Sequence, residues 1–105
     1  MIDYVETCFK EFVSGIRTVV TKHYEDDFPT LPVPEIGVDY GRKYWRIWKG
    51  GGQKSVYGFV RKEDGAIFKA ATWKAPQTKT KTAIRGYVTD EFPLDYVTAY
   101  GVKYA

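Results

Sequence analysis

Several residue types that carry chemistry are scarce in this chain of 105 residues. It has one cysteine, Cys8, one histidine, His23, and no asparagine. A single cysteine excludes an internal disulfide and a zinc site built from cysteines. With one histidine, and with carboxylates concentrated in connecting segments, neither a serine–histidine–acid set nor a metal cluster can be assembled. We therefore expect a protein that is not an enzyme and that needs no cofactor.

Long apolar runs are also missing. No stretch approaches the roughly 20 consecutive apolar residues that a membrane span requires. The first residues lack the basic start and the unbroken apolar run of a secretory leader. These absences predict a soluble, cytoplasmic protein with no membrane partner.

Apolar and aromatic residues are plentiful, at 44% and 17% of the chain. This content and this length suit one domain with a modest core, so we expect a single domain over residues 1–105. A core of this size would gain stability from burial against partner subunits, which makes an oligomer plausible on physical grounds.

Positive charge is concentrated in the middle of the chain. The formal net charge of +3 divides into −5 for residues 1–40, +10 for residues 41–86 and −2 for residues 87–105. Such an asymmetry indicates a polyanionic partner. It also permits the acidic end of one copy to dock on the basic middle of another, or simple solvation of both.

Residues 1–24 are predicted to form a helix, regular from about Asp3 to His23, because apolar residues recur every three or four positions. Gly15 weakens the helix interior by up to ~1 kcal/mol and would allow a strand to approach closely. The apolar face indicates a helix that covers a sheet, although a coiled-coil seam has the same spacing. The face consists of Ile2, Val5, Phe9, Phe12, Val13, Ile16, Val19 and Val20.

Residues 25–38 are predicted to be an extended connector, because Pro29, Pro32 and Pro34 each remove a backbone donor. The rest of the chain, residues 39–105, has the β-branched and aromatic pattern of strands bounded by turns. Asp64-Gly65 is the strongest hairpin signal, since glycine there supplies the positive φ of a tight turn. Five antiparallel strands are predicted, near residues 39–49, 54–62, 66–74, 82–89 and 95–103.

The predicted fold class is therefore α+β, mainly β. An N-terminal helix would pack on a strongly bent five-stranded antiparallel sheet that forms a small open barrel. An open barrel has unpaired edges, and pairing the edge of one copy with the next would build a homo-oligomeric ring.

The first predicted strand mixes cations with aromatic residues on both faces. Bases of a single-stranded nucleic acid stack on rings while Arg and Lys meet its phosphates, so this mixture favours nucleic-acid binding. Alternatively, Trp45 and Ile47 belong to the core and the cations protect a sheet edge. One face would carry Arg42, Tyr44, Arg46 and Trp48, and the other Lys43, Trp45, Ile47 and Lys49.

A second cation-rich stretch, residues 69–81, contains another tryptophan, Trp73. It would bind a phosphate backbone with little sequence preference and steep salt dependence. Trp73 would serve equally well as a plug for one end of the barrel. The candidate nucleic-acid-binding residues from both stretches are Arg42, Lys43, Arg46, Trp48, Lys49, Lys54, Lys69, Trp73, Lys74, Lys79 and Lys81.

The segment SVYGFVRKEDGAIFKAATWKAP, residues 55–76, resembles the signature of a family of small marine cyanophage-type proteins. Its most specific parts are the Asp64-Gly65 hairpin and the run KAATWKAP at residues 69–76. That family is similar in fold to Sm and LSm proteins, in which a helix sits on a bent five-stranded barrel and the copies close into a ring. The resemblance implies an Sm-like domain that binds RNA or DNA.

The Sm nucleotide pocket uses an acidic residue and an asparagine between the second and third strands, and an Arg-Gly pair near the last two. Here residues 62–65 read Lys-Glu-Asp-Gly, and Arg85-Gly86 matches the pair. The resemblance thus adds Arg85 to the candidate residues. The resulting expectation is a phage module that binds single-stranded RNA or DNA with little sequence specificity. The alternative is a phage structural or assembly adaptor that acts through protein–protein contacts.

Overall fold

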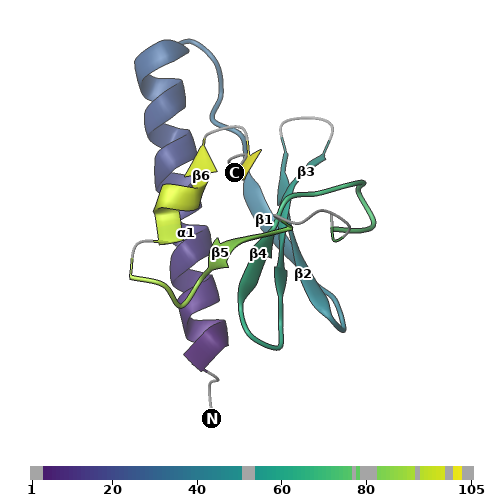
Figure 1. Cartoon of the computed structure of the whole chain (residues 1–105). Helices are drawn as coiled ribbons and strands as arrows, with labels where there is room; N and C mark the ends of the chain where they lie inside the picture. Colours follow the sequence, from purple (N-terminus) through teal and green to yellow (C-terminus); the bar gives the residue numbers. More distant parts are fainter. Residues whose placement is uncertain are drawn as a thin grey trace.

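The computed structural model describes residues 4–50, 54–76, 78, 83–91, 93–98 and 101–102. One long helix lies beside a five-stranded antiparallel sheet, and a short 3₁₀ helix with a two-stranded hairpin packs against the helix (Figure 1). The predicted class, α+β and mainly β, is therefore confirmed. Within the described residues, no helix is both long and apolar enough to cross a membrane.

Helix α1 spans Tyr4–Asp27 and buries the predicted apolar face. Its side chains Phe9, Phe12, Val13, Ile16 and Val20 are buried, Val5 and Val19 are half-buried, and Ile2 lies outside the described residues. The helix continues through Glu25, Asp26 and Asp27, which were predicted to begin the connector. These carboxylates lie at the negative end of the helix dipole, and Nδ1 of His23 lies 3.1 Å from Asp27 Oδ2.

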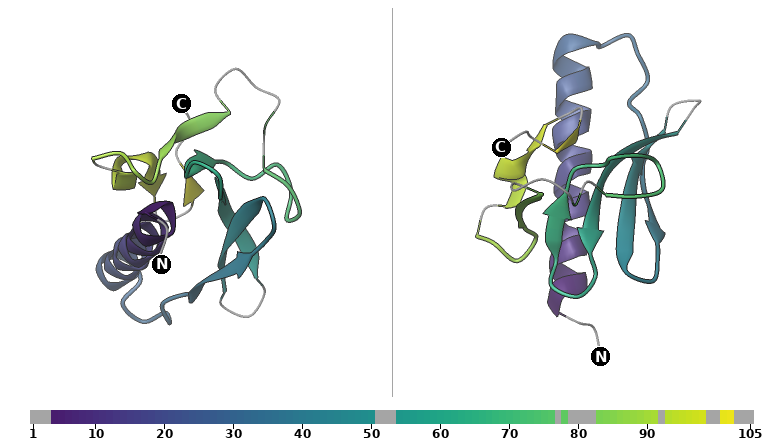
Figure 2. Two further views of the ribbon diagram at one scale, coloured as in Figure 1. Left: turned by 90° about the horizontal axis from the view of Figure 1, so that it is seen from below. Right: turned by 45° about the vertical axis from the view of Figure 1, so that its right-hand side comes forward.

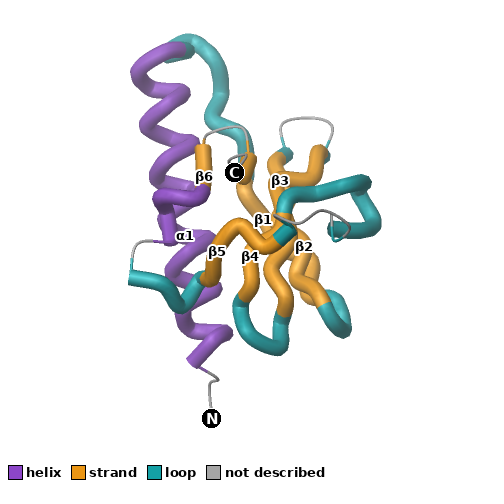
Figure 3. The backbone as a smooth tube through the Cα atoms, viewed as in Figure 1, coloured by secondary structure: helices purple, strands orange, loops and turns teal. Residues whose placement is uncertain are grey.

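The main sheet follows the order of the chain: β1 (Ile36–Tyr40), β2 (Tyr44–Lys49), β3 (Ser55–Arg61), β4 (Ala66–Phe68) and β5 (Ile84–Tyr87). Figure 3 shows these strands lying together on one side of α1. Gly65 has a φ of 80°, which agrees with the predicted tight turn between β3 and β4.

The prediction of one strand over residues 39–49 is wrong. The chain turns back at residues 41–43, so that Tyr40 pairs with Trp45 and Asp39 with Arg46. A Cβ atom on Gly41 would lie 2.5 Å from the carbonyl oxygen of Tyr44, so the turn needs a residue without a side chain. The connector is correspondingly shorter than predicted, because β1 already begins at Ile36.

Two other predicted strands also differ. Strand β4 ends at Phe68, and the chain then forms a loop closed by a bridge between Ala70 and Pro76. In place of a strand over 95–103, the structure has the 3₁₀ helix η1 (Pro93–Tyr96), then β6 (Val97–Thr98) and β7 (Gly101–Val102), which form a separate sheet. The five-stranded sheet is therefore not closed into a barrel by its C-terminal strand.

The two faces of the sheet have separate apolar clusters. Trp45, Ile47, Val60 and Ile67 join the helix in the larger cluster and are 0–4% exposed. This agrees with the alternative in which Trp45 and Ile47 belong to the core. The opposite face, here called the outer face, carries a smaller cluster of Phe59, Ala66 and Phe68, against which Tyr44, Val56, Ala70, Ala83 and Tyr87 pack.

The C-terminal hairpin is tied to the sheet by Tyr57, whose hydroxyl donates a hydrogen bond to the carbonyl of Thr98. Burial raises the pKa of this hydroxyl, which therefore stays protonated at neutral pH. On the helix, Gly15 gives room to Leu94 of η1, since a Cβ atom there would lie 2.6 Å from Leu94 Cδ1. The close approach predicted at Gly15 thus comes from the 3₁₀ helix and not from a strand.

Candidate nucleic-acid interface

Three cation–ring pairs lie along β2 on the outer face. Lys43 Nζ lies 5.6 Å from the centroid of the Tyr44 ring, and Lys54 Nζ lies 4.2 Å from that of Trp48. Between them, Arg46 Cζ lies 4.4 Å from the centroid of Trp73. Each distance is within the range of a cation–π attraction.

The outer face therefore gathers part of the predicted set. Trp73 and Lys74 reach it from the loop that follows β4, which projects away from α1 in the views of Figure 2. The predicted residues that the structure brings together are Lys43, Arg46, Trp48, Lys54, Trp73 and Lys74.

Arg46 is held by three groups. Its Nε and Nη2 donate to Asp39 Oδ2 at 3.2 and 2.9 Å, and its Nη1 donates to the carbonyl oxygen of Trp73 at 3.1 Å. The side chain is only 24% exposed. Since a guanidinium has five N–H donors, two remain for a ligand, and most of the function of Arg46 is to join β1, β2 and the loop after β4.

Trp48 lies flat over the backbone of its cross-strand partner, Gly37. A Cβ atom on Gly37 would overlap the six-membered part of the indole. The indole Nε1 is buried and has no hydrogen-bond partner among the described residues. Trp48 is therefore positioned by contact with the sheet, and Lys54 lies over its ring.

A second arginine on this face is also paired. Arg61 donates to both carboxylate oxygens of Asp64, at 3.0 and 2.6 Å, and lies 5.5 Å from the centroid of Phe68. The hydrogen bonds from Arg61 lower the pKa of Asp64 below its usual value. Asp64 also accepts a hydrogen bond from the backbone N–H of Ala66, as a turn residue does.

A groove opens on this side at the end of the β1–β2 hairpin. We call it the turn groove. It has a volume of about 350 Å³ and combines aromatic, cationic and carboxylate side chains. Its lining consists of Asp39, Tyr40, Gly41, Lys43, Tyr44, Arg46, Phe59 and Lys74.

The remaining predicted residues lie elsewhere. Lys49 faces the helix, with its Nζ 5.5 Å from the centroid of the Tyr24 ring, so its assignment to the same surface is wrong. Arg42 is exposed in the turn and not on a strand face, and Lys69 is half-buried directly after β4. Arg85 is on β5, where its Nε is buried without a hydrogen-bond partner among the described residues. Lys79 and Lys81 lie outside the described residues.

Two residues of the interface were missing from the predicted set, Asp39 and Tyr44. The pairing of Asp39 with Arg46 needs the turn at residues 41–43, because in a single strand the two residues would be far apart. The turn has one indication in the sequence, Gly41, but the neighbouring residues lack the Asn-Gly or Asp-Gly pattern of a tight hairpin.

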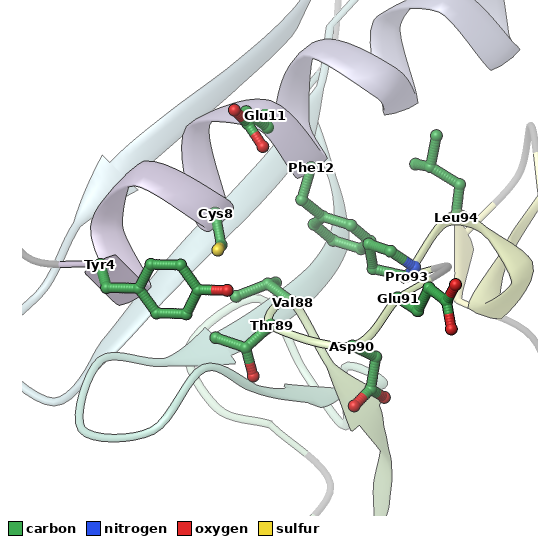
Figure 4. A pocket seen from close by; sticks show the side chains of 10 residues that line it. All are labelled: Tyr4, Cys8, Glu11, Phe12, Val88, Thr89, Asp90, Glu91, Pro93 and Leu94. Carbon is green, nitrogen blue, oxygen red and sulfur yellow. The ribbon is translucent and has the colours of Figure 1, made fainter.

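A different hollow lies at the start of α1. It has a volume of about 390 Å³ and is formed by Tyr4, Cys8, Glu11 and Phe12 together with the segment Val88–Leu94 (Figure 4). A hydrogen bond with the Cys8 thiol raises the pKa of the Tyr4 hydroxyl. Glu11, Asp90 and Glu91 make the lining acidic, which is unfavourable for phosphates. Among the described residues, no three His, Cys, Asp or Glu side chains gather as a metal site would require.

Comparison with known proteins gives one finding. No curated protein and no solved structure matches the chain significantly. A family model described as "Family of unknown function (DUF7717)" matches residues 4–102, which is nearly the whole chain. The chain therefore belongs to this family of unknown function, DUF7717.

Proposed function

We propose that this chain is a nucleic-acid-binding module whose outer face binds single-stranded RNA or DNA. The observation that supports this most directly is the row of cation–ring pairs along β2. A single strand needs flat surfaces for its bases and positive charge for its phosphates at alternating positions. Tyr44, Trp48 and Trp73 supply rings, and the adjoining cations supply charge.

The proposal includes what the resemblance implies for the whole protein. These expectations are a cyanophage origin, a location in the host cytoplasm and an Sm-like homo-oligomeric ring. A ring would present several copies of the outer face to one strand, which raises the overall affinity without any new contact.

The number of phosphate contacts follows from the ion pairs. Arg46 and Arg61 already have carboxylate partners, which leaves Lys43, Lys54 and Lys74, with Arg42 beside them, as cations without one among the described residues. Three or four contacts correspond to a slope of about −2 to −3 in a plot of log K against log salt for a single strand. If all ten predicted cations met phosphates, the slope would be about −7.

The test is a salt titration of binding to a fluorescent single-stranded oligonucleotide, followed by anisotropy. We expect binding at ~50 mM salt and a slope of about −2 to −3 for each bound protomer. Replacing two lysines together, Lys54→Gln with Lys74→Gln, is expected to reduce the slope by about 1.4 units. Lys22→Gln, an exposed cation of the helix, is the matched control and is expected to leave the slope unchanged.

A wild-type protein that shows no binding at ~50 mM salt, where phosphate contacts are strongest, would contradict the proposal. That result would favour the alternative, a phage structural or assembly adaptor. The pairing of Arg46 and Arg61 with carboxylates supports this alternative, because paired cations contribute little to binding of a polyanion. Retention of an acidic protein partner by the same outer face would then be the observation to seek.

A further inference from the structure

The turn groove contains a carboxylate, Asp39, in a surface that otherwise suits phosphates. A carboxylate repels a phosphate, so it weakens backbone binding unless it meets a hydrogen-bond donor of the ligand. The donors of a single-stranded nucleic acid lie on the edges of its bases. This placement of Asp39 therefore concerns a base and not the backbone.

The hydrogen bonds of Asp39 leave one of its oxygens available. Both contacts from Arg46 go to Oδ2, and no hydrogen bond to Oδ1 comes from the described residues. The Asp39 side chain is 44% exposed, so a ligand in the groove can reach it. Arg46 holds the carboxylate in place and is itself fixed by the carbonyl of Trp73, so the acceptor is rigidly positioned.

The rest of the groove suits one nucleotide. Tyr44 and Tyr40 provide ring faces, and Phe59, which is 3% exposed, provides an apolar floor. Lys43 and Lys74 line the same groove and carry the charge that a phosphate on either side of the base would need. A volume of about 350 Å³ is at the small end of ligand pockets, which agrees with one base and not with a larger group.

The four bases differ in what they would offer to Asp39. Guanine presents two adjacent donors, N1–H and the 2-amino group. Adenine and cytosine place an acceptor nitrogen beside their amino group, and uracil places its single N–H between two carbonyl oxygens; these acceptors oppose a carboxylate. We infer that the turn groove is a base-recognition site that prefers guanine, with Asp39 accepting hydrogen bonds from its Watson–Crick edge.

This inference rests on the proposed nucleic-acid binding and goes beyond the expected lack of sequence specificity. Its test compares oligouridines that carry one central guanine, inosine or adenine, as RNA and as DNA, by anisotropy at fixed salt. We expect guanine to bind about tenfold more tightly than adenine, the usual effect of one good pair of hydrogen bonds. Inosine, which lacks the 2-amino group, is expected to bind with intermediate affinity.

Asp39→Asn is expected to reduce the preference of guanine over adenine to less than about twofold. The ratio of the two affinities is the readout, because loss of a negative charge raises all affinities together. Asp64→Asn is the matched control: it removes the same charge from the other arginine–aspartate pair, outside the groove, and should leave the ratio unchanged.

Each outcome decides the inference. Equal binding of the guanine and adenine oligomers by the wild-type protein, or a preference that persists in Asp39→Asn, would overturn guanine recognition while leaving the proposed binding intact. Binding to none of the oligomers would overturn both. Should Asp39→Asn fail to fold, the inosine comparison with the wild-type protein still decides the question.

Discussion

At the scale of single residues, Arg46 shows how a side chain that the sequence assigns to binding can be mainly structural. It contacts Asp39 on β1, the carbonyl of Trp73 and the Trp73 ring. Alternating cations and aromatic residues predicted the outer face, but the pattern alone does not distinguish a cation that meets phosphate from one that meets a carboxylate. The partners come from other segments, so only the fold reveals them.

Arg46→Ala is expected to lower the free energy of unfolding by about 2 to 3 kcal/mol, because it removes hydrogen bonds to a charged group and leaves a buried carbonyl without its donor. Urea denaturation followed by circular dichroism measures this. Arg42→Ala, in the exposed turn, is the control and is expected to change stability by less than about 0.5 kcal/mol. Equal effects of the two substitutions would contradict the structural role of Arg46.

The Arg61–Asp64 pair predicts a pH dependence. Because Arg61 lowers the pKa of Asp64 in the folded state, the unfolded state binds a proton at higher pH than the folded state does. The stabilising contribution is therefore complete above the unfolded pKa of about 3.9 and is lost as pH falls through the lower folded value.

Asp64→Asn should accordingly destabilise the protein at pH 7, and the difference from the wild type should shrink toward about pH 3. Urea titrations at several pH values measure it. In an Arg61→Gln background the same substitution should have little pH-dependent effect, since the partner is gone. A difference that is constant with pH would refute the coupling.

At the scale of elements, the β1–β2 hairpin is the largest difference between prediction and structure. Residues 39–49 have the composition of one long strand, and Gly41 is the sole interruption. Helix α1, in contrast, was predicted well, since an apolar face repeated over several turns is a strong signal. The C-terminal segment was predicted poorly because a two-residue strand such as β6 forms only where another segment offers a partner.

Packing between β1 and β2 gives a prediction for Gly37. Gly37→Ala would place a Cβ atom where the Trp48 ring lies, so the ring must move. We expect a loss of about 1 to 3 kcal/mol in the free energy of unfolding, with a change in tryptophan fluorescence. In a Trp48→Ala background the same substitution should cost much less, because the overlapping ring is absent. Additive effects in this double-mutant cycle would show that the two residues do not interact.

At the scale of the whole molecule, the sheet has two edges, β1 and β5, which are not paired with each other. Unpaired edges are commonly covered by pairing with another chain. The predicted ring thus stays a prediction, and its physical basis is the open sheet together with a small core.

Native mass spectrometry, with light scattering after gel filtration, would test the ring. We expect a discrete homo-oligomer that persists in moderate salt, since strand pairing depends less on ionic strength than contact between the acidic and basic segments does. A monomer at micromolar concentration would contradict the ring, whereas an oligomer that dissociates in salt would indicate docking between oppositely charged segments.

The sequence by itself determined the helix and its buried face, the β-rich remainder, the Asp64-Gly65 turn and the concentration of positive charge in residues 41–86. These follow from local spacing and composition, which depend only on neighbours along the chain. The tertiary structure alone decided which cations share a face, which of them are paired, and that Asp39 joins Arg46 beside Tyr44 in the turn groove. Those relations depend on strand pairing between segments, and a one-residue change in register would move every side chain to the other face.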